Sequence, residues 1–251
     1  MLFDHILLFS IVIGIALGIG LVILLIKHPR FAYIALFLSI VAGQLGRISL
    51  GTDIRGGSAI IATDVIVILI GFSWIIKKLV YDRTFGKTPL ATPIVLFGGV
   101  ALLSYFIGLS NLMNVDSLDL KTAILSFSYW FRFAAYALLY FFSRDFLAEH
   151  KSNARFLFKL IFLTSILVSI TGFIQLLVMP DFTEYAIKYG WDPHQDRLLG
   201  TFFDPNFIGT YFAMVLALGF SMYSNATKHL KVLIIFSILF CSLALLLTFS
   251  R

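Results

Sequence analysis

The sequence predicts an all-α, polytopic integral membrane protein with about eight membrane-spanning helices. Of its 251 residues, 60% are apolar and only 13% are charged, whereas about a quarter of the residues are charged in soluble domains. The apolar residues also fall into blocks that can cross a hydrocarbon core, which takes roughly 20 helical residues. Barrel strands would alternate polar and apolar residues, so helices are the expected spanning elements.

The individual spans follow from the apolar blocks and from the polar breaks between them. We expect helices over residues 5–27, 31–46, 58–79, 92–110, 122–143, 156–179, 207–224 and 231–250. The second block is short and follows His28-Pro29-Arg30, where proline forbids simple continuation of the first helix. We expect residues 1–251 to form a single membrane domain, the N-terminal part of a larger polytopic protein.

Lys and Arg residues gather in alternate loops. The first, third, fifth and seventh connections hold twelve of them, and the intervening connections hold five. Cytoplasmic loops are enriched in Lys and Arg, which places the first set inside and the polar loop of residues 181–206 outside. A re-entrant second segment would move only the N-terminus to the inside. The net charge of +6 therefore reflects membrane orientation, and no nucleic acid is expected as a partner.

Two charged residues lie within expected spans. Arg132 is near the middle of the fifth, where a charge is costly unless it faces the protein interior or a wet cavity. Asp64 in the third span is its nearest candidate partner by depth. The two could form a structural pair that locks two helices, or Arg132 could form the cationic wall of a cavity for an anionic substrate. Gln44 and Gln175 are expected to hydrogen-bond to neighbouring helices.

The polar loop of residues 181–206 divides into two parts. Its first half carries four residues at helical spacing, namely Phe182, Tyr185, Ala186 and Tyr189. This pattern predicts a short amphipathic helix in the membrane interface. The second half contains Asp192-Pro193 and Asp204-Pro205, which favour turns. Asn206 can then cap a helix that begins at Phe207, and such a helix N-terminus favours anions.

Several kinds of chemistry find little support in the sequence. Asp192, His194 and Asp196 are typical of a solvated loop, so no metal is expected there. The chain has no Walker-type glycine loop, which argues against an ATP-driven pump, and no cofactor is expected. With Cys241 as the only cysteine, an intrachain disulfide is impossible.

The segment Arg197-Leu198-Leu199-Gly200-Thr201-Phe202-Phe203-Asp204-Pro205-Asn206-Phe207-Ile208-Gly209 resembles a motif of the O-antigen ligase and O-antigen polymerase superfamily. Members of this superfamily carry an Arg-x-x-Gly-Thr-Phe-x-Asn-Pro-Asn-like segment just before a membrane helix. The pair Gly172 and Gln175 in the preceding helix and Arg132 in the fifth span also fit. The ending Leu-Thr-Phe-Ser-Arg resembles the family's Ser-Arg-Gly element cut after Arg251. Asp204 departs from the family's usual asparagine.

The resemblance implies a metal-independent glycosyltransferase of bacterial cell-surface polysaccharide assembly, in the cytoplasmic (inner) membrane. Its donor would be a glycan linked to polyprenyl pyrophosphate, and its acceptor a glycan or a lipid. Arg197, then Arg251 and then Arg132 are the candidates for binding the pyrophosphate, because fixed arginines stabilise a leaving group that gains charge.

In this family segment, Gly200, Thr201, Asp204, Pro205 and Asn206 are expected to shape the loop and the helix N-terminus. A general base must still activate the acceptor hydroxyl. His194 is a weak candidate for that base, since the family places its candidate catalytic histidine after the position of Arg251. The present chain alone is accordingly expected to be inactive.

A second hypothesis is a transporter or flippase for an anionic lipid or solute. It rests on Arg132 and Asp64 within the membrane. Transporters often contain internal repeats and helices broken at corresponding places, and neither is evident in the sequence.

Overall fold

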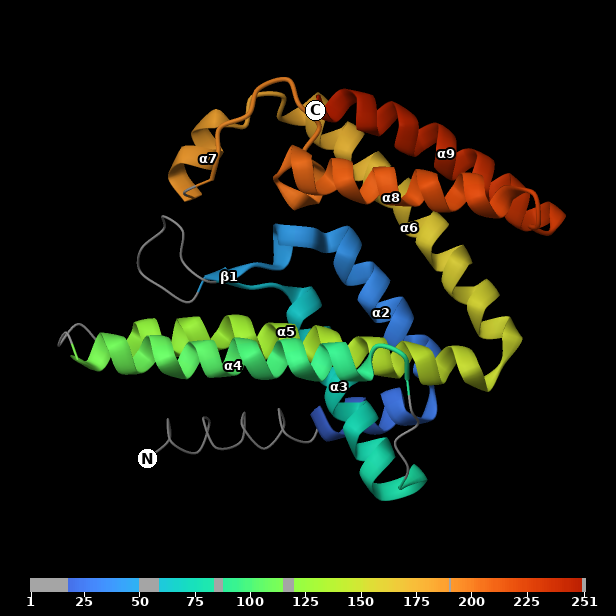
Figure 1. Cartoon of the computed structure of the whole chain (residues 1–251). Coiled ribbons are helices and arrows are strands. Elements are labelled where there is room, and N and C mark those ends of the chain that lie inside the picture. Colours follow the sequence, from blue (N-terminus) through green and yellow to red (C-terminus); the bar gives the residue numbers. More distant parts are fainter. Residues whose placement is uncertain (1–17, 50–58, 84–87, 115–119, 190, 250–251) are drawn as a thin grey trace, which may run out of the picture. The chain divides into compact units, whose positions relative to one another are not determined.

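The computed structural model describes residues 18–49, 59–83, 88–114, 120–189 and 191–249. Over these residues the chain is helical apart from loops and one antiparallel pair of two-residue strands, β1 (Ile48–Ser49) and β2 (Ala59–Ile60) (Figure 1). Within the described ranges, six helices are long and apolar enough to cross a membrane. The prediction of an all-α, multi-pass membrane protein is confirmed.

The helices follow the expected spans closely. The first span is described as a helix over Gly18–Lys27, and its earlier residues lie outside the described ranges. The other expected spans contain the helices α2 (Pro29–Ala42), α3 (Ala62–Ile76), α4 (Ala91–Asn114), α5 (Leu120–Glu149), α6 (Lys151–Val178), α8 (Pro205–Tyr223) and α9 (Lys228–Thr248). Because α3 has only 15 residues before a π-helical segment, Lys77–Asp82, the count of eight spans stays a prediction.

Some helix boundaries differ from the expected ones for a simple reason. The helix α5 runs six residues past the predicted end at residue 143, through Arg144 and Asp145 to Glu149. A polar residue ends the lipid-compatible stretch, but it does not end a helix when neither glycine nor proline follows. The break before α2 lies where expected, with Pro29 as its first residue, since proline fits the first turn of a helix.

The chain divides into two compact units. One comprises Met1–Ala32 and Ile66–Ala148, and the other comprises Tyr33–Val65 and Glu149–Arg251. The boundaries fall within α2 and α3 and at the junction of α5 and α6. The expectation of a single membrane domain stays a prediction.

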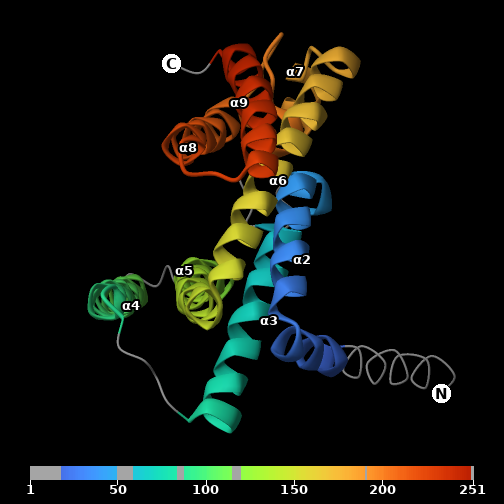
Figure 2. The ribbon, with the colours of Figure 1, turned by 90° about the vertical axis from the view of Figure 1, so that its right-hand side faces the viewer.

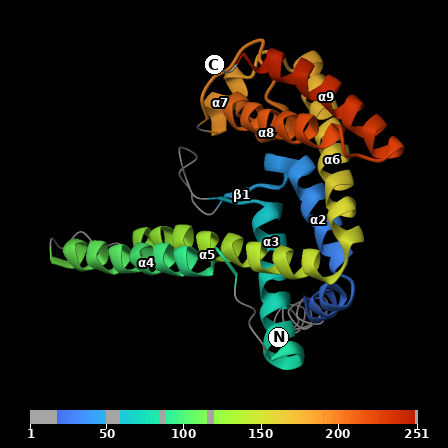
Figure 3. The same cartoon turned by 45° about the vertical axis from the view of Figure 1, so that its right-hand side comes forward.

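In the first unit, α4 and α5 lie side by side (Figure 3). The Trp130 indole N–H donates to the Gly98 carbonyl oxygen at 2.9 Å, and the Phe97 and Phe133 rings have centroids 5.0 Å apart. The helix α3 meets α5 at Gly71, where a Cβ would lie 3.0 Å from the Leu138 side chain. The small residue therefore permits close helix packing.

A polar cluster joins the C-terminal ends of α3 and α5 in this unit. Lys78 Nζ lies 2.9 Å from carboxylate oxygens of both Asp82 and Asp145. The Trp74 indole N–H also donates to Asp145 at 2.9 Å. The positive-inside rule assigns these two helix ends to the same side of the membrane, and their contact agrees with that assignment.

In the second unit, α6, α8 and α9 form a bundle (Figure 2). Its centre contains the fully buried side chains of Phe162, Phe212 and Ile234. The Ser165 and Ser237 hydroxyls form a 2.7 Å hydrogen bond between α6 and α9. This bundle is the support on which the polar loop folds.

Candidate functional site

The loop between α6 and α8 packs on the bundle at a contact between small residues. Gly200 adopts φ +54°, in the left-handed region that favours glycine. A Cβ added at Gly200 would lie 3.5 Å from the Cα atom of Gly172 in α6. A Cβ added at Gly172 would lie 2.6 Å from the buried Leu198 side chain. The two glycines thus allow the loop backbone to approach α6 more closely than larger residues would permit.

Gln175, one turn beyond Gly172, fixes the same part of the loop. Its side-chain carbonyl oxygen accepts hydrogen bonds from the backbone N–H groups of Leu199 at 2.8 Å and Gly200 at 3.1 Å. Its amide nitrogen donates to the Met179 carbonyl oxygen at 3.0 Å. The partners are loop backbone groups, in place of the neighbouring membrane helix expected from the sequence.

The end of α2 also contacts this loop. The Thr201 hydroxyl donates to the Val41 carbonyl oxygen at 2.8 Å. Gly43, at φ +53°, approaches so closely that a Cβ there would lie 2.5 Å from the Thr201 carbonyl oxygen. This contact brings the 3₁₀ turn Gly43–Gly46 against the 3₁₀ turn Gly200–Phe202.

Arg197 belongs to the polar loop, and its guanidinium contacts the C-terminal end of α9. Its Nε–H donates to the Thr248 carbonyl oxygen at 2.8 Å, and one terminal nitrogen donates to the Phe249 carbonyl oxygen at 3.3 Å. The Leu198 N–H donates to the Leu247 carbonyl oxygen at 2.9 Å. A cation is favourable at a helix C-terminus, so this arginine stabilises the join between loop and helix. A guanidinium has five N–H donors, and these bonds leave others for a ligand.

Asp204 is the N-cap of α8, which corrects the expected start of that helix. Its carboxylate accepts from the backbone N–H groups of Asn206 at 2.7 Å and Phe207 at 3.1 Å. The prediction that Asn206 caps a helix beginning at Phe207 is wrong, because Pro205 occupies the first helical position and Asp204 precedes it. The carboxylate also occupies the amides that would otherwise favour an anion.

The first half of the loop contains the expected short helix, α7 (Thr183–Tyr189). Phe182 and Ala186 are fully buried against Leu199. The rings of Phe182, Tyr185, Trp191 and Phe203 contact one another, with Trp191 and Phe203 centroids 4.6 Å apart. Residues after α7 pair with the residues just before it. The Phe182 N–H donates to the His194 carbonyl oxygen at 2.9 Å. Before α8 begins, the second half has no α-helix: it consists of irregular chain and turns, including the 3₁₀ turn Gly200–Phe202.

An open pocket of about 270 Å³ lies between the end of α2 and the polar loop. It is lined by Gln44, Arg47, Trp191, Asp192, His194, Phe202, Phe203, Asp204 and Phe207. The Arg47 guanidinium lies over the Trp191 ring, 5.2 Å from its centroid. The pocket thus combines a cation, an aromatic face, two carboxylates and an imidazole.

The surroundings of His194 favour its neutral form. Burial lowers the pKa of the imidazole below its usual value, and the positive charge of Arg197 lowers it further. The carboxylates of Asp204 and Asp192 act in the opposite direction, but the net shift is downward. A neutral imidazole can accept a proton from a hydroxyl group, which is the requirement for a general base.

The other predicted residues lie elsewhere. Asp64 is buried near the start of α3, where its carboxylate accepts from the Ile61 N–H at 3.2 Å. Because α3 begins at Ala62, and not at residue 58 as expected, Asp64 lies in the first helical turn. Arg132 is half-buried near the middle of α5, in the other unit, so the proposed pair stays a prediction. Arg251 lies outside the described residues.

Two pocket residues, Arg47 and Trp191, carry no functional role in the sequence interpretation. Arg47 is one of the five Lys and Arg residues in the less basic connections, and Trp191 lies within the polar loop of residues 181–206. The distribution of Lys and Arg over the loops could have linked them, because it places the loop after α2 and the loop after α6 on the same side of the membrane. It does not specify that the two loops contact each other.

The described residues contain no group of three or more His, Cys, Asp or Glu side chains arranged for a metal ion. No protein-family model matches the chain. Comparisons with curated proteins and with solved structures likewise give no significant match. Likeness to the O-antigen ligase and polymerase superfamily therefore rests on residues 197–209 and the features that accompany them in the sequence.

Proposed function

We propose that the protein transfers a glycan from a polyprenyl-pyrophosphate carrier to an acceptor hydroxyl on the outer face of a bacterial cytoplasmic membrane. The observation that carries the proposal is the pocket beside the family-like segment. It offers Arg47 for an anion, Trp191 for the face of a sugar ring, and neutral His194 for a proton. Such a set suits a donor that has both a pyrophosphate and a glycan.

The reaction would be a displacement at the anomeric carbon of the donor sugar. The acceptor oxygen forms the new glycosidic bond while the bond to the pyrophosphate oxygen breaks, and the polyprenyl pyrophosphate leaves with that electron pair. Arg47 and the remaining N–H donors of Arg197 would stabilise the developing charge without a metal. The acceptor proton would go to His194, which lines the same pocket.

Asp204 has a different part in this scheme. Its carboxylate caps α8 through two backbone amides, so its charge is turned toward the helix N-terminus. It would hold the loop in shape and keep the His194 pKa from falling further. The asparagine that the family usually carries could form the same cap.

The proposal can be tested in cells that lack the chromosomal gene and express variants of the full-length protein. Arg47→Gln and His194→Gln are expected to abolish surface polysaccharide and to leave lipid-linked glycan accessible from outside the cytoplasmic membrane. Immunoblots of the membrane fraction verify that each variant is inserted. Lys159→Gln, an exposed change in the first half of α6, serves as the control and should retain polysaccharide.

Normal polysaccharide in both pocket variants would refute the proposal. Loss of polysaccharide with lipid-linked glycan confined to the inner face would instead favour the transporter hypothesis, because a transfer defect acts after the lipid carrier has crossed the membrane.

A further inference from the structure

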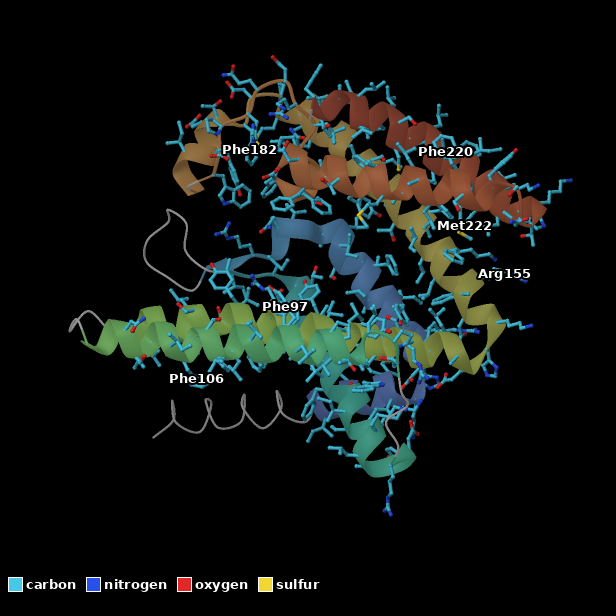
Figure 4. The ribbon with its side chains drawn as sticks, viewed as in Figure 1. Phe97, Phe106, Arg155, Phe182, Phe220 and Met222 are labelled. Atoms are coloured by element: carbon cyan, nitrogen blue, oxygen red, sulfur yellow. The ribbon has the colours of Figure 1, made fainter. Side chains whose placement is uncertain are left out.

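A second pocket lies at the opposite end of the α6, α8 and α9 bundle. It has a volume of about 440 Å³ and lies where α6 begins, α8 ends and α9 begins. Figure 4 shows two of its residues, Arg155 on α6 and Met222 at the end of α8. It shares no lining residue with the pocket beside the polar loop.

The two surfaces of this pocket differ in chemistry. Its rim is exposed and polar, with the guanidinium of Arg155 and the donor groups of Ser221, Asn225 and Thr227. Its floor is apolar and includes Leu230, which is only 5% exposed. Phe158 and Met222 also line it and pack against the bundle core. A ligand that fits must therefore present both a hydrogen-bonding anion and an apolar portion.

The position of the pocket indicates the source of such a ligand. All three helices that form it are long and apolar enough to span a membrane, so their ends lie near the boundary between hydrocarbon and water. Phe220, next to rim residue Ser221, is 66% exposed on α8 (Figure 4) and would face lipid tails. Other basic residues flank the pocket in sequence, among them Lys151, Lys228 and Lys231. Basic pockets between membrane helices bind anionic lipid headgroups.

We infer that this pocket binds the phosphodiester headgroup of an anionic glycerophospholipid, such as phosphatidylglycerol. Arg155 pairs with the phosphate, the rim hydroxyls and amide bind the headgroup oxygens, and the glycerol and first acyl carbons cover the apolar floor. This lipid site is independent of the proposed glycosyl transfer, because it lies at the other end of the bundle and uses none of the same residues.

Native mass spectrometry of the full chain in detergent, titrated with dioleoyl-phosphatidylglycerol or dioleoyl-phosphatidylcholine, tests this inference. The wild type is expected to bind phosphatidylglycerol preferentially. Arg155→Gln should weaken that binding roughly tenfold, the typical effect of one charge-assisted hydrogen bond. Ser221→Trp, which obstructs the rim and keeps every charge, should weaken it as well.

Lys159→Gln removes one positive charge from the same helix and does not alter the lining of the pocket, so it should bind like the wild type. An equal loss in Lys159→Gln and Arg155→Gln would overturn the inference, because it would indicate unspecific attraction to a basic surface. Equal affinity of the wild type for both lipids would overturn it too, as would displacement of phosphatidylglycerol by millimolar inorganic phosphate. Circular dichroism verifies that the variants are folded.

Discussion

Replacing Gln175 by methionine should detach the polar loop from α6. Methionine matches glutamine in length but cannot replace the oxygen that accepts from the buried Leu199 and Gly200 amides. Each unsatisfied buried donor costs about 1–3 kcal/mol, so opening of the loop should become easier by at least about 2 kcal/mol. That free energy corresponds to roughly 30-fold faster exchange of these two amide hydrogens.

Hydrogen–deuterium exchange in detergent micelles measures this change directly. Thr171→Val is the matched control, because the Thr171 hydroxyl donates only to the Val168 carbonyl oxygen of the same helix at 2.9 Å. Exchange at Leu199 and Gly200 should be unchanged in the control. Unchanged exchange in Gln175→Met would refute the assignment of Gln175 as the residue that fixes the loop.

Three further predictions concern the loop and its charges. Asp204→Asn should keep the cap on α8 and lower the His194 pKa, because it removes a carboxylate that raises it. Arg197→Gln should raise the His194 pKa, since the positive charge of Arg197 lowers it in the wild type. NMR titration of the imidazole measures the pKa in both variants. Shifts of the opposite sign would contradict the electrostatic account. Gly200→Ala should lower the unfolding free energy by about 1 kcal/mol or more through its positive φ, measured as a lower thermal midpoint. Gly108→Ala, which has open space around its Cβ position, is the control and should not lower that midpoint.

The sequence predicted the helices better than their contacts. Hydropathy locates an apolar block because the bilayer requires one, and Pro29, the first residue of α2, sets a sharp start. The polar continuation of α5 to Glu149 escaped prediction because hydropathy marks the edge of the membrane and not the end of the helix. The Asp204-Pro205 pair at the start of α8 contained enough information to identify Asp204 as the cap, since proline favours the first helical position.

The site was only partly predictable. Residues 197–209 drew attention to Arg197, but no sequence pattern indicated that this side chain would bond to the end of α9, about fifty residues further along the chain. The pocket depends on Thr201 reaching Val41, and such a contact between distant segments leaves no local pattern. Its cation, Arg47, therefore became apparent only in three dimensions.

Binding of a fluorescent polyprenyl-pyrophosphate-linked glycan to the purified full-length protein tests the central claim most directly. Arg47→Gln should weaken binding roughly tenfold through loss of a charge-assisted hydrogen bond. Arg155→Gln, which changes the pocket at the other end of the bundle, should leave the affinity for this glycan at the wild-type value. If Arg47→Gln binds the lipid-linked glycan as tightly as the wild type does, the pocket beside the polar loop is not the donor site.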